Sequence, residues 1–167
     1  MSSNPKVVVL MGSRSDWGAM EHAVKMLEGL GIPHDVRILS AHRTPGALTS
    51  YVSEVEQRGA EVFIAAAGGA AHLAGVVASL TIKPVLAVPM ESKLSGLDSL
   101  LSMVQMPAGI PVPTLAVGKA GAINAALAAA QILALADRDL AERFSADRRA
   151  RAEAVLADPD PRRPRPE

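Results

Sequence analysis

Short polar loops directly follow several apolar runs, and their side chains are those that bind or transform a small polar ligand. Gly12, Ser13, Ser15 and Asp16 follow the first run. Glycine permits a tight turn, hydroxyls and free N–H groups at a helix start favour phosphate, and a carboxylate accepts hydrogen bonds from ribose hydroxyls. The segment contains neither G-x-G-x-x-G nor a Walker A pattern. An ordinary turn with Asp16 as the N-cap therefore explains it equally well.

The loop after the second run contains the best candidate for proton transfer. It carries Ser40, Ala41, His42 and Arg43, and Pro45 then suits the first turn of a helix. Histidine changes its proton near neutral pH, and arginine presents a fixed fork of donors to phosphate. The alternative is a solvent-exposed loop in which the histidine is incidental.

A third loop combines small residues with a second histidine. Gly68, Gly69 and Ala70 allow a ligand ring to lie directly on the backbone, and His72 follows in the first turn of the next helix. A packed histidine that bonds a nearby carbonyl explains His72 equally well. Residues 89–96 form a longer loop of a kind that often acts as a lid. Lys119 follows the last apolar run, and a solvated surface cation explains it as well as a role in a site.

Alternating strand and helix patterns position these loops. Short apolar runs, typical of strands buried on both faces, cover residues 6–11, 35–39, 62–66, 85–88 and 114–117. Helical patterns cover residues 16–30, 45–58, 71–80, 97–104 and 120–136. With right-handed crossovers, this alternation predicts a three-layer α/β sandwich around a flavodoxin-like parallel sheet of about five strands. Ligands of such sheets bind outside the carboxyl ends of the strands, where these loops meet.

The chain changes character after residue 136. Residues 137–157 are charged but keep apolar side chains at roughly helical spacing. A one-sided helix outside a completed sandwich needs a surface to cover, and a neighbouring subunit would supply one. We expect residues 1–157 to form a single α/β domain that includes this C-terminal helix. Residues 158–167 are rich in proline and arginine, and we expect a disordered tail.

Composition excludes several classes of function. The 167 residues fit one domain, and a net charge of zero argues against a nucleic-acid binder. The absence of cysteine excludes disulfides, thiolate metal sites and a cysteine nucleophile, and it fits a cytoplasmic protein. The aromatic content of 2% leaves few platforms for bases or flavins. Four dispersed histidines predict no metal site, His22 and His34 being poor candidates, and we expect no signal peptide or membrane span.

Several motifs occur in a fixed order along the chain. They are GSRSD at 12–16, SAHRTP at 40–45, AGGAAHL at 67–73, SMVQMPAGIPV at 102–112, NAAL at 124–127 and AQIL at 130–133. This set closely resembles the class I PurE family, the N5-carboxyaminoimidazole ribonucleotide mutases of purine biosynthesis, and the resemblance covers about residues 7–156. Relatives that carboxylate aminoimidazole ribonucleotide directly with CO2 usually carry Lys-Gly after the Ala-His pair. This chain has Arg43 and Thr44 there, which resembles class I.

The resemblance implies a reaction and a set of roles. The carboxylate of the ribonucleotide substrate would move from N5 to ring carbon C4, without metal, ATP or organic cofactor. His42 matches the catalytic histidine. The positions that match substrate-binding residues are Gly12, Ser13, Ser15, Asp16, Ser40, Ala41, Arg43, Gly68, Gly69, Ala70 and His72. The family forms octamers whose C-terminal helices reach over neighbours. The alternatives are the CO2-dependent carboxylase and a non-catalytic nucleotide- or flavin-binding module.

Overall fold

Four parallel strands form the centre of the molecule in a computed structural model that describes residues 4–158, 160 and 162. Their order in the sheet is β2-β1-β3-β4. The strands are β1 (Val7–Met11), β2 (His34–Ile38), β3 (Val62–Ala67) and β4 (Val85–Pro89). β1 lies between β2 and β3, and the switch point of this flavodoxin-like order falls between β1 and β3.

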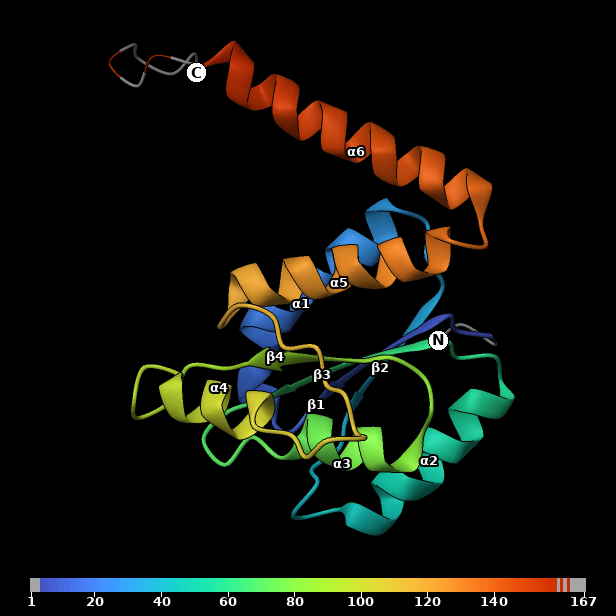
Figure 1. Cartoon of the computed structure of the whole chain (residues 1–167), viewed down its shortest axis with the longest axis vertical. Coiled ribbons are helices and arrows are strands. Elements are labelled where there is room, and N and C mark those ends of the chain that lie inside the picture. The colour runs from blue at the N-terminus through green and yellow to red at the C-terminus, as the bar shows by residue number, and fades with distance from the viewer. Residues whose placement is uncertain (1–3, 159, 161, 163–167) are drawn as a thin grey trace.

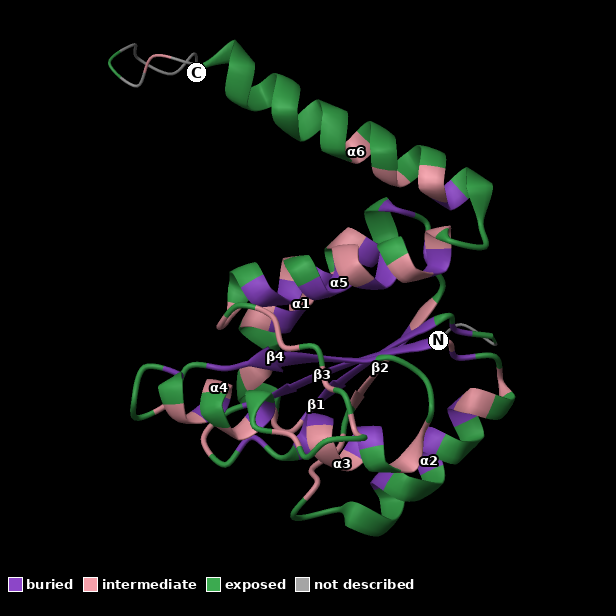
Figure 2. Ribbon diagram, viewed as in Figure 1, coloured by how far each residue is buried: buried purple, intermediate pink, exposed green. Residues whose placement is uncertain are grey.

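Helices cover both faces of this sheet (Figure 1). α1 (Trp17–Gly29) and α5 (Lys119–Ala134) lie on one face, and α2 (Pro45–Gln57) and α3 (Leu73–Leu80) lie on the other. α4 (Leu97–Val104) follows β4 beside the second face. β1, β3 and β4 are therefore buried along their whole length, as Figure 2 shows. The predicted three-layer α/β sandwich is confirmed.

Two apolar cores result from the alternation of side chains along β1. Val7, Val9 and Met11 join the core under α1 and α5, whereas Val8 and Leu10 join the core under α2 and α3. The α5 contribution consists almost entirely of alanines, whose small side chains allow the helix to lie close to α1 and the sheet. Burial of these two cores fixes the strands, and so fixes the loops at their ends.

The prediction of a fifth strand at 114–117 is wrong, because the sheet that the described residues form has four strands and this segment forms an isolated bridge. Thr114 makes a single parallel bridge to Ala87, with bonds of 2.9 Å from the Ala87 N–H to the Pro113 carbonyl and from the Leu115 N–H to the Ala87 carbonyl. The next bond to β4 comes from the Gly118 N–H, which donates to the Pro89 carbonyl at 2.8 Å. Pro89, the last residue of β4, has no N–H to donate to the Leu115 carbonyl, so the ladder does not continue along residues 115–117. The segment therefore lies along the outer edge of β4 without forming a full strand.

The start of the first helix also differs from the expectation. A 3-10 turn, η1 (Arg14–Asp16), precedes α1, and the Asp16 carboxylate does not cap α1. It accepts instead from the Ser13 N–H at 3.2 Å, while the Ser13 hydroxyl accepts from the Ser15 N–H at 3.3 Å. This reciprocal capping box bends the chain back at the end of β1.

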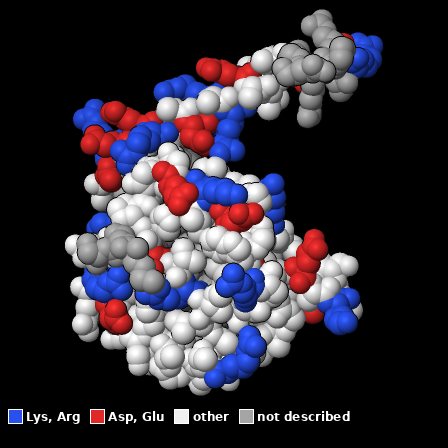
Figure 3. Space-filling view, turned by 180° about the vertical axis from the view of Figure 1, so that it is seen from behind, with Lys and Arg blue, Asp and Glu red and all other residues white. Residues whose placement is uncertain are grey.

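α6 (Arg138–Ala157) projects from the sandwich (Figure 1). Its first turns are anchored to the domain, because Leu140 is buried and Arg143 donates to the Leu30 carbonyl at 2.9 Å. Further along, the Arg151 Nη2 donates to the Met26 Sδ of α1 at 3.6 Å. Val155 and Leu156, further along, are 71% and 73% exposed. Figure 3 shows acidic and basic side chains gathered along this helix.

The domain expectation stays a prediction, and the expected disordered tail lies outside the described residues except for 158, 160 and 162. No helix in the described part of the chain combines the length and the apolar character that crossing a membrane requires.

Candidate active site

The loops that follow β1, β2, β3 and β4 surround one cavity of about 660 Å³ at the carboxyl ends of the strands. The first three supply every residue predicted from the sequence to bind or transform substrate. These lining residues are Gly12, Ser13, Ser15, Asp16, Ser40, Ala41, His42, Arg43, Gly68, Gly69, Ala70 and His72. Segments from residues 12 to 72 therefore converge on a single hollow, although their individual roles stay predictions.

The two candidate histidines are in direct contact. His42 Nε2 lies 2.9 Å from His72 Nδ1, and the ring planes stand at 83° with 4.9 Å between centroids. Both side chains are exposed to the cavity rather than packed in the core. Since one ring nitrogen donates and the other accepts, the contact couples the tautomers of the two imidazoles. The alternative in which His72 bonds a nearby carbonyl does not describe its side chain.

Arg43 ties the second loop to the first. Its Nη2 donates to the Gly12 carbonyl at 2.9 Å, and its backbone N–H donates to the Ser40 hydroxyl at 3.1 Å. The Ser40 N–H in turn donates to the Thr44 hydroxyl at 2.9 Å, which closes the turn ahead of α2. This network holds the hydroxyl of Ser40 and the guanidinium of Arg43 at the cavity wall.

Asp16 is an ionisable residue of the cavity wall, and its pKa is raised. Partial burial raises the pKa of the Asp16 carboxyl above its usual range, and hydrogen bonds from the Ser13 backbone and the Ser15 hydroxyl oppose that rise. The Asp16 carboxylate lines the cavity, and each of its oxygens accepts one local hydrogen bond. Such a group suits hydroxyl donors of a ligand better than an anion.

The glycine loop after β3 is held from α4. The Gly69 N–H donates to the Ser99 hydroxyl at 2.9 Å, and the Ser102 hydroxyl donates to the Gly69 carbonyl at 3.3 Å. Gly69 has a φ of +70°, a conformation that other residues rarely adopt. A Cβ on Gly68 would lie 3.4 Å from the Met90 Cβ, so glycine lets the loop after β4 approach closely.

That fourth loop supplies residues that the sequence-based site did not include. Glu91, Ser92 and Lys93 line the cavity, as do Ala67 and Leu73 at the ends of β3 and the glycine loop. The signal was available: residues 89–96 follow a parallel strand and resemble a lid, so position alone pointed to the same edge. The loop contains four charged or polar side chains, and only the fold shows that Glu91, Ser92 and Lys93 line the cavity.

The remaining candidates from the sequence lie elsewhere. The His34 Nδ1 contacts the Ile32 carbonyl at 2.9 Å at the start of β2, and His22 lies within α1. Lys119 borders a smaller adjoining hollow with Ser15 and Asp16. No group of three or more possible metal ligands of the His, Cys, Asp or Glu type occurs among the described residues.

A cavity with hydroxyls, one guanidinium, a coupled pair of imidazoles and a floor of glycine and alanine can hold a small anionic ligand and move a proton on it. Its place at the carboxyl edge of a flavodoxin-like sheet is where α/β proteins bind nucleotides. The fold and the cavity thus define the class: a flavodoxin-like α/β protein with acid–base side chains at the sheet edge where such folds bind nucleotides.

Comparison with known proteins identifies the family. Residues 6–154 match the AIR carboxylase family. The chain is 55% identical over 162 residues to the N5-carboxyaminoimidazole ribonucleotide mutase of Escherichia coli K12, with 96% of each chain covered, and 56% identical over 157 residues to that of Pseudomonas aeruginosa, with 93% and 96% covered. The crystal structure of Treponema denticola PurE superposes with a TM-score of 0.84 at 32% identity, covering 92% of this chain and 96% of that one. The protein belongs to the AIR carboxylase family.

Proposed function

We propose that the protein is an N5-carboxyaminoimidazole ribonucleotide mutase, which moves a carboxylate from N5 to C4 of the aminoimidazole ring in purine biosynthesis. The observation that carries the proposal is the His42–His72 contact of 2.9 Å inside a cavity floored by small residues. The identity of 55–56% to curated mutases over nearly the whole chain supports it.

The proposed reaction is balanced without a co-reactant. Cleavage of the N5–carboxyl bond releases CO2, and N5 gains a proton as it takes the bonding electrons. The nucleophilic C4 then forms a bond to the same CO2, and the hydrogen on C4 leaves as a proton. One proton is thus delivered at N5 and one removed at C4, so a single carrier that reaches both atoms closes the cycle.

His42 is the group that we assign to this proton transfer. It lies at the cavity wall, and its ring nitrogen contacts His72, which can hold one tautomer and one ring orientation. Ser13, Asp16 and Arg43 are assigned to the ribose and phosphate. Gly68, Gly69 and Ala70 are assigned to the aminoimidazole ring of the substrate. Their small size leaves room for that ring against the backbone, which larger side chains would fill.

Confinement of CO2 is the second contribution. Holding CO2 beside C4 replaces a bimolecular encounter, and such orientation supplies up to ~7–11 kcal/mol in the best intramolecular cases. Acid–base transfer adds a factor of typically ~10²–10⁴. The loop after β4, which reaches the cavity through Glu91, Ser92 and Lys93, is placed to limit the escape of CO2.

A competing function is the carboxylase that adds free CO2 to aminoimidazole ribonucleotide. The Arg43–Thr44 pair after His42 argues against it, because relatives of that type usually have Lys-Gly there. Turnover is therefore compared with the N5-carboxylated ribonucleotide and with aminoimidazole ribonucleotide plus low bicarbonate. We expect efficient turnover of the first substrate only. Preferential use of free CO2 would contradict the proposed mutase, and binding of both nucleotides without turnover would favour a non-catalytic module.

We further infer a cytoplasmic homo-octamer. The cysteine-free sequence suits a reducing compartment, and the exposed Val155 and Leu156 on the projecting α6 suit burial against a neighbouring subunit. A solution mass of eight chains is expected. A stable monomer would contradict the assignment of α6 to subunit contacts.

A further inference from the structure

Lys93 is a charged side chain at the cavity that lacks a partner among the residues that the structure describes. No hydrogen bond or ion pair joins it to any other described residue, and it lines the cavity beside Glu91. We propose that the Lys93 ammonium binds an anionic group of the substrate, either its phosphate or its carboxylate. The proposal rests on the proposed function for the identity of that substrate.

The other cation of the cavity is already engaged. Arg43 Nη2 donates to the Gly12 carbonyl at 2.9 Å, and Arg43 Nε lies 3.5 Å from the Ser40 hydroxyl. Some of the N–H donors of the guanidinium are therefore occupied in holding the two loops together. A substrate with both a phosphate and a carboxylate presents more negative charge than the remaining donors of Arg43 can match.

The balance of charge around the cavity supports the same conclusion. Its ionisable lining residues other than histidine are Asp16, Glu91, Arg43 and Lys93, which sum to zero when all are charged. A phosphate alone brings about −1.5 to −2 near pH 7. Since no ion pair ties Lys93 to Glu91, a bound anion does not have to displace a carboxylate from the ammonium.

The loop that carries Lys93 is anchored at both sides. The Met90 N–H donates to the Ala67 carbonyl at 2.9 Å, and the Ser92 hydroxyl donates to the Asp98 carboxylate in the first turn of α4. The Ser95 N–H donates to the Ser92 carbonyl at 3.0 Å. These contacts hold the backbone at the cavity rim, while the long stem of Lys93 stays free to follow a ligand.

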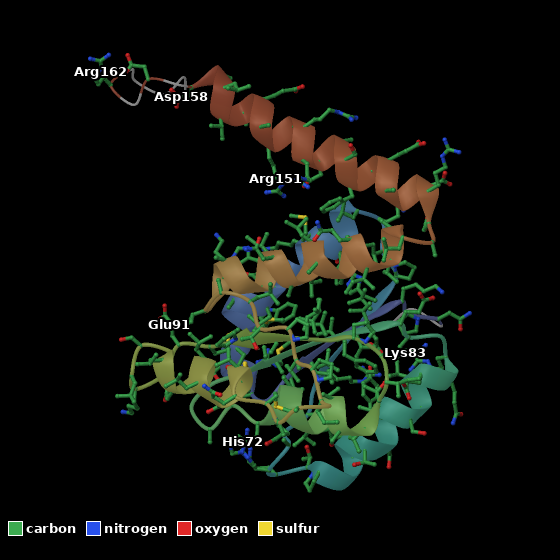
Figure 4. All side chains as sticks on the ribbon, in the orientation of Figure 1. His72, Lys83, Glu91, Arg151, Asp158 and Arg162 are labelled. Atoms are coloured by element: carbon green, nitrogen blue, oxygen red, sulfur yellow. The ribbon has the colours of Figure 1, made fainter. Side chains whose placement is uncertain are left out.

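Lys83 provides a matched control. It precedes β4, whereas Glu91 and Lys93 follow that strand, so the control lysine lies at the opposite end of β4 from Glu91 (Figure 4). It does not line the cavity. Replacement of Lys83 removes the same charge from the molecule without altering the site.

The test compares Lys93→Met, Lys93→Arg and Lys83→Met in the full chain. We expect Lys93→Met to raise KM about tenfold with kcat within about twofold, the size of a lost hydrogen bond to a charged group. Lys93→Arg should retain most of the affinity, and Lys83→Met should match the wild type. Calorimetric binding of 4-carboxy-5-aminoimidazole ribonucleotide, and of the same compound without its phosphate, identifies the anion. A loss confined to the phosphorylated compound indicates the phosphate, and an equal loss for both indicates the carboxylate.

Two results would overturn the inference: unchanged KM and affinity in Lys93→Met, or an equal rise in Lys83→Met, which would indicate only the net charge of the protein. Binding is measured independently of turnover. A wild-type protein that binds 4-carboxy-5-aminoimidazole ribonucleotide but does not form it from the N5-carboxylated ribonucleotide would refute the mutase. The binding data for Lys93→Met would still decide the role of Lys93.

Discussion

Replacement of His42 by asparagine separates its chemistry from its structural role. Asparagine keeps a polar side chain of smaller size but cannot accept and release a proton near neutral pH. In the structure the substitution removes one contact, the 2.9 Å bond to the His72 ring. Neither ring is buried, so no core packing is lost.

The two expected effects differ greatly in size. An ordinary hydrogen bond contributes about 0.5–1.5 kcal/mol to stability, and one between exposed side chains lies at the low end of that range. Loss of general acid–base transfer costs ~10²–10⁴ in turnover, which corresponds to about 3–5 kcal/mol of activation free energy. We therefore expect kcat to fall by at least a hundredfold while the free energy of unfolding changes by less than about 1 kcal/mol.

The assay measures turnover of the N5-carboxylated ribonucleotide and urea unfolding on the same preparations. His34→Asn is the matched control, because His34 carries the same ring at the opposite end of β2, where its Nδ1 contacts the Ile32 carbonyl. It should retain wild-type kcat. If His42→Asn turns over substrate within about tenfold of the wild type, His42 is not the proton carrier. Equal losses in both variants would point to a general effect of losing an imidazole.

Three further predictions concern neighbouring groups. Arg43→Leu should raise KM more than it lowers kcat, and an unchanged KM would refute the phosphate assignment. Tyr51→Phe should cost about 1.5–3 kcal/mol in urea unfolding, because the Tyr51 hydroxyl donates to the buried Asp35 carboxylate at 3.1 Å. Burial and Asp35 raise the pKa of Tyr51, so wild-type stability should fall above about pH 10, where the unfolded tyrosine ionises, and this alkaline loss should be smaller in Tyr51→Phe. The pKa of Asp16 is also raised on folding, so its charged form opposes folding at neutral pH. Asp16→Asn should therefore keep or increase the urea midpoint at pH 7, lose that gain below the ordinary aspartate pKa, and weaken substrate binding.

The pattern of apolar runs was sufficient to predict β1 to β4 to within a residue or so. Runs such as Val7–Met11 are buried on both faces, and only a strand between two helical layers explains five consecutive apolar residues of this kind. The same reasoning failed at 114–117. The apolar content there is similar, but Pro89 of β4 has no N–H to donate to the Leu115 carbonyl, so the segment does not become a full strand.

The site was predictable as a set of loops but not as a set of contacts. The carboxyl ends of parallel strands share one edge, which is why residues 12–16, 40–43 and 68–72 could be grouped from the sequence. The sequence did not show that the Asp16 carboxylate serves a capping box with Ser13, or that Arg43 reaches the Gly12 carbonyl. Those contacts depend on loop conformations that propensity does not determine. Glu91 and Lys93 were missed for the same reason.

Strand order explains why the two histidines meet. His42 follows β2 and His72 follows β3, and these strands are not neighbours, since β1 lies between them. Their loops meet beyond the end of β1, where Gly12 follows the strand and its carbonyl accepts from the Arg43 Nη2 at 2.9 Å. The capping box then carries the chain into α1. The topology of the sheet, rather than either histidine loop alone, therefore creates the acid–base pair.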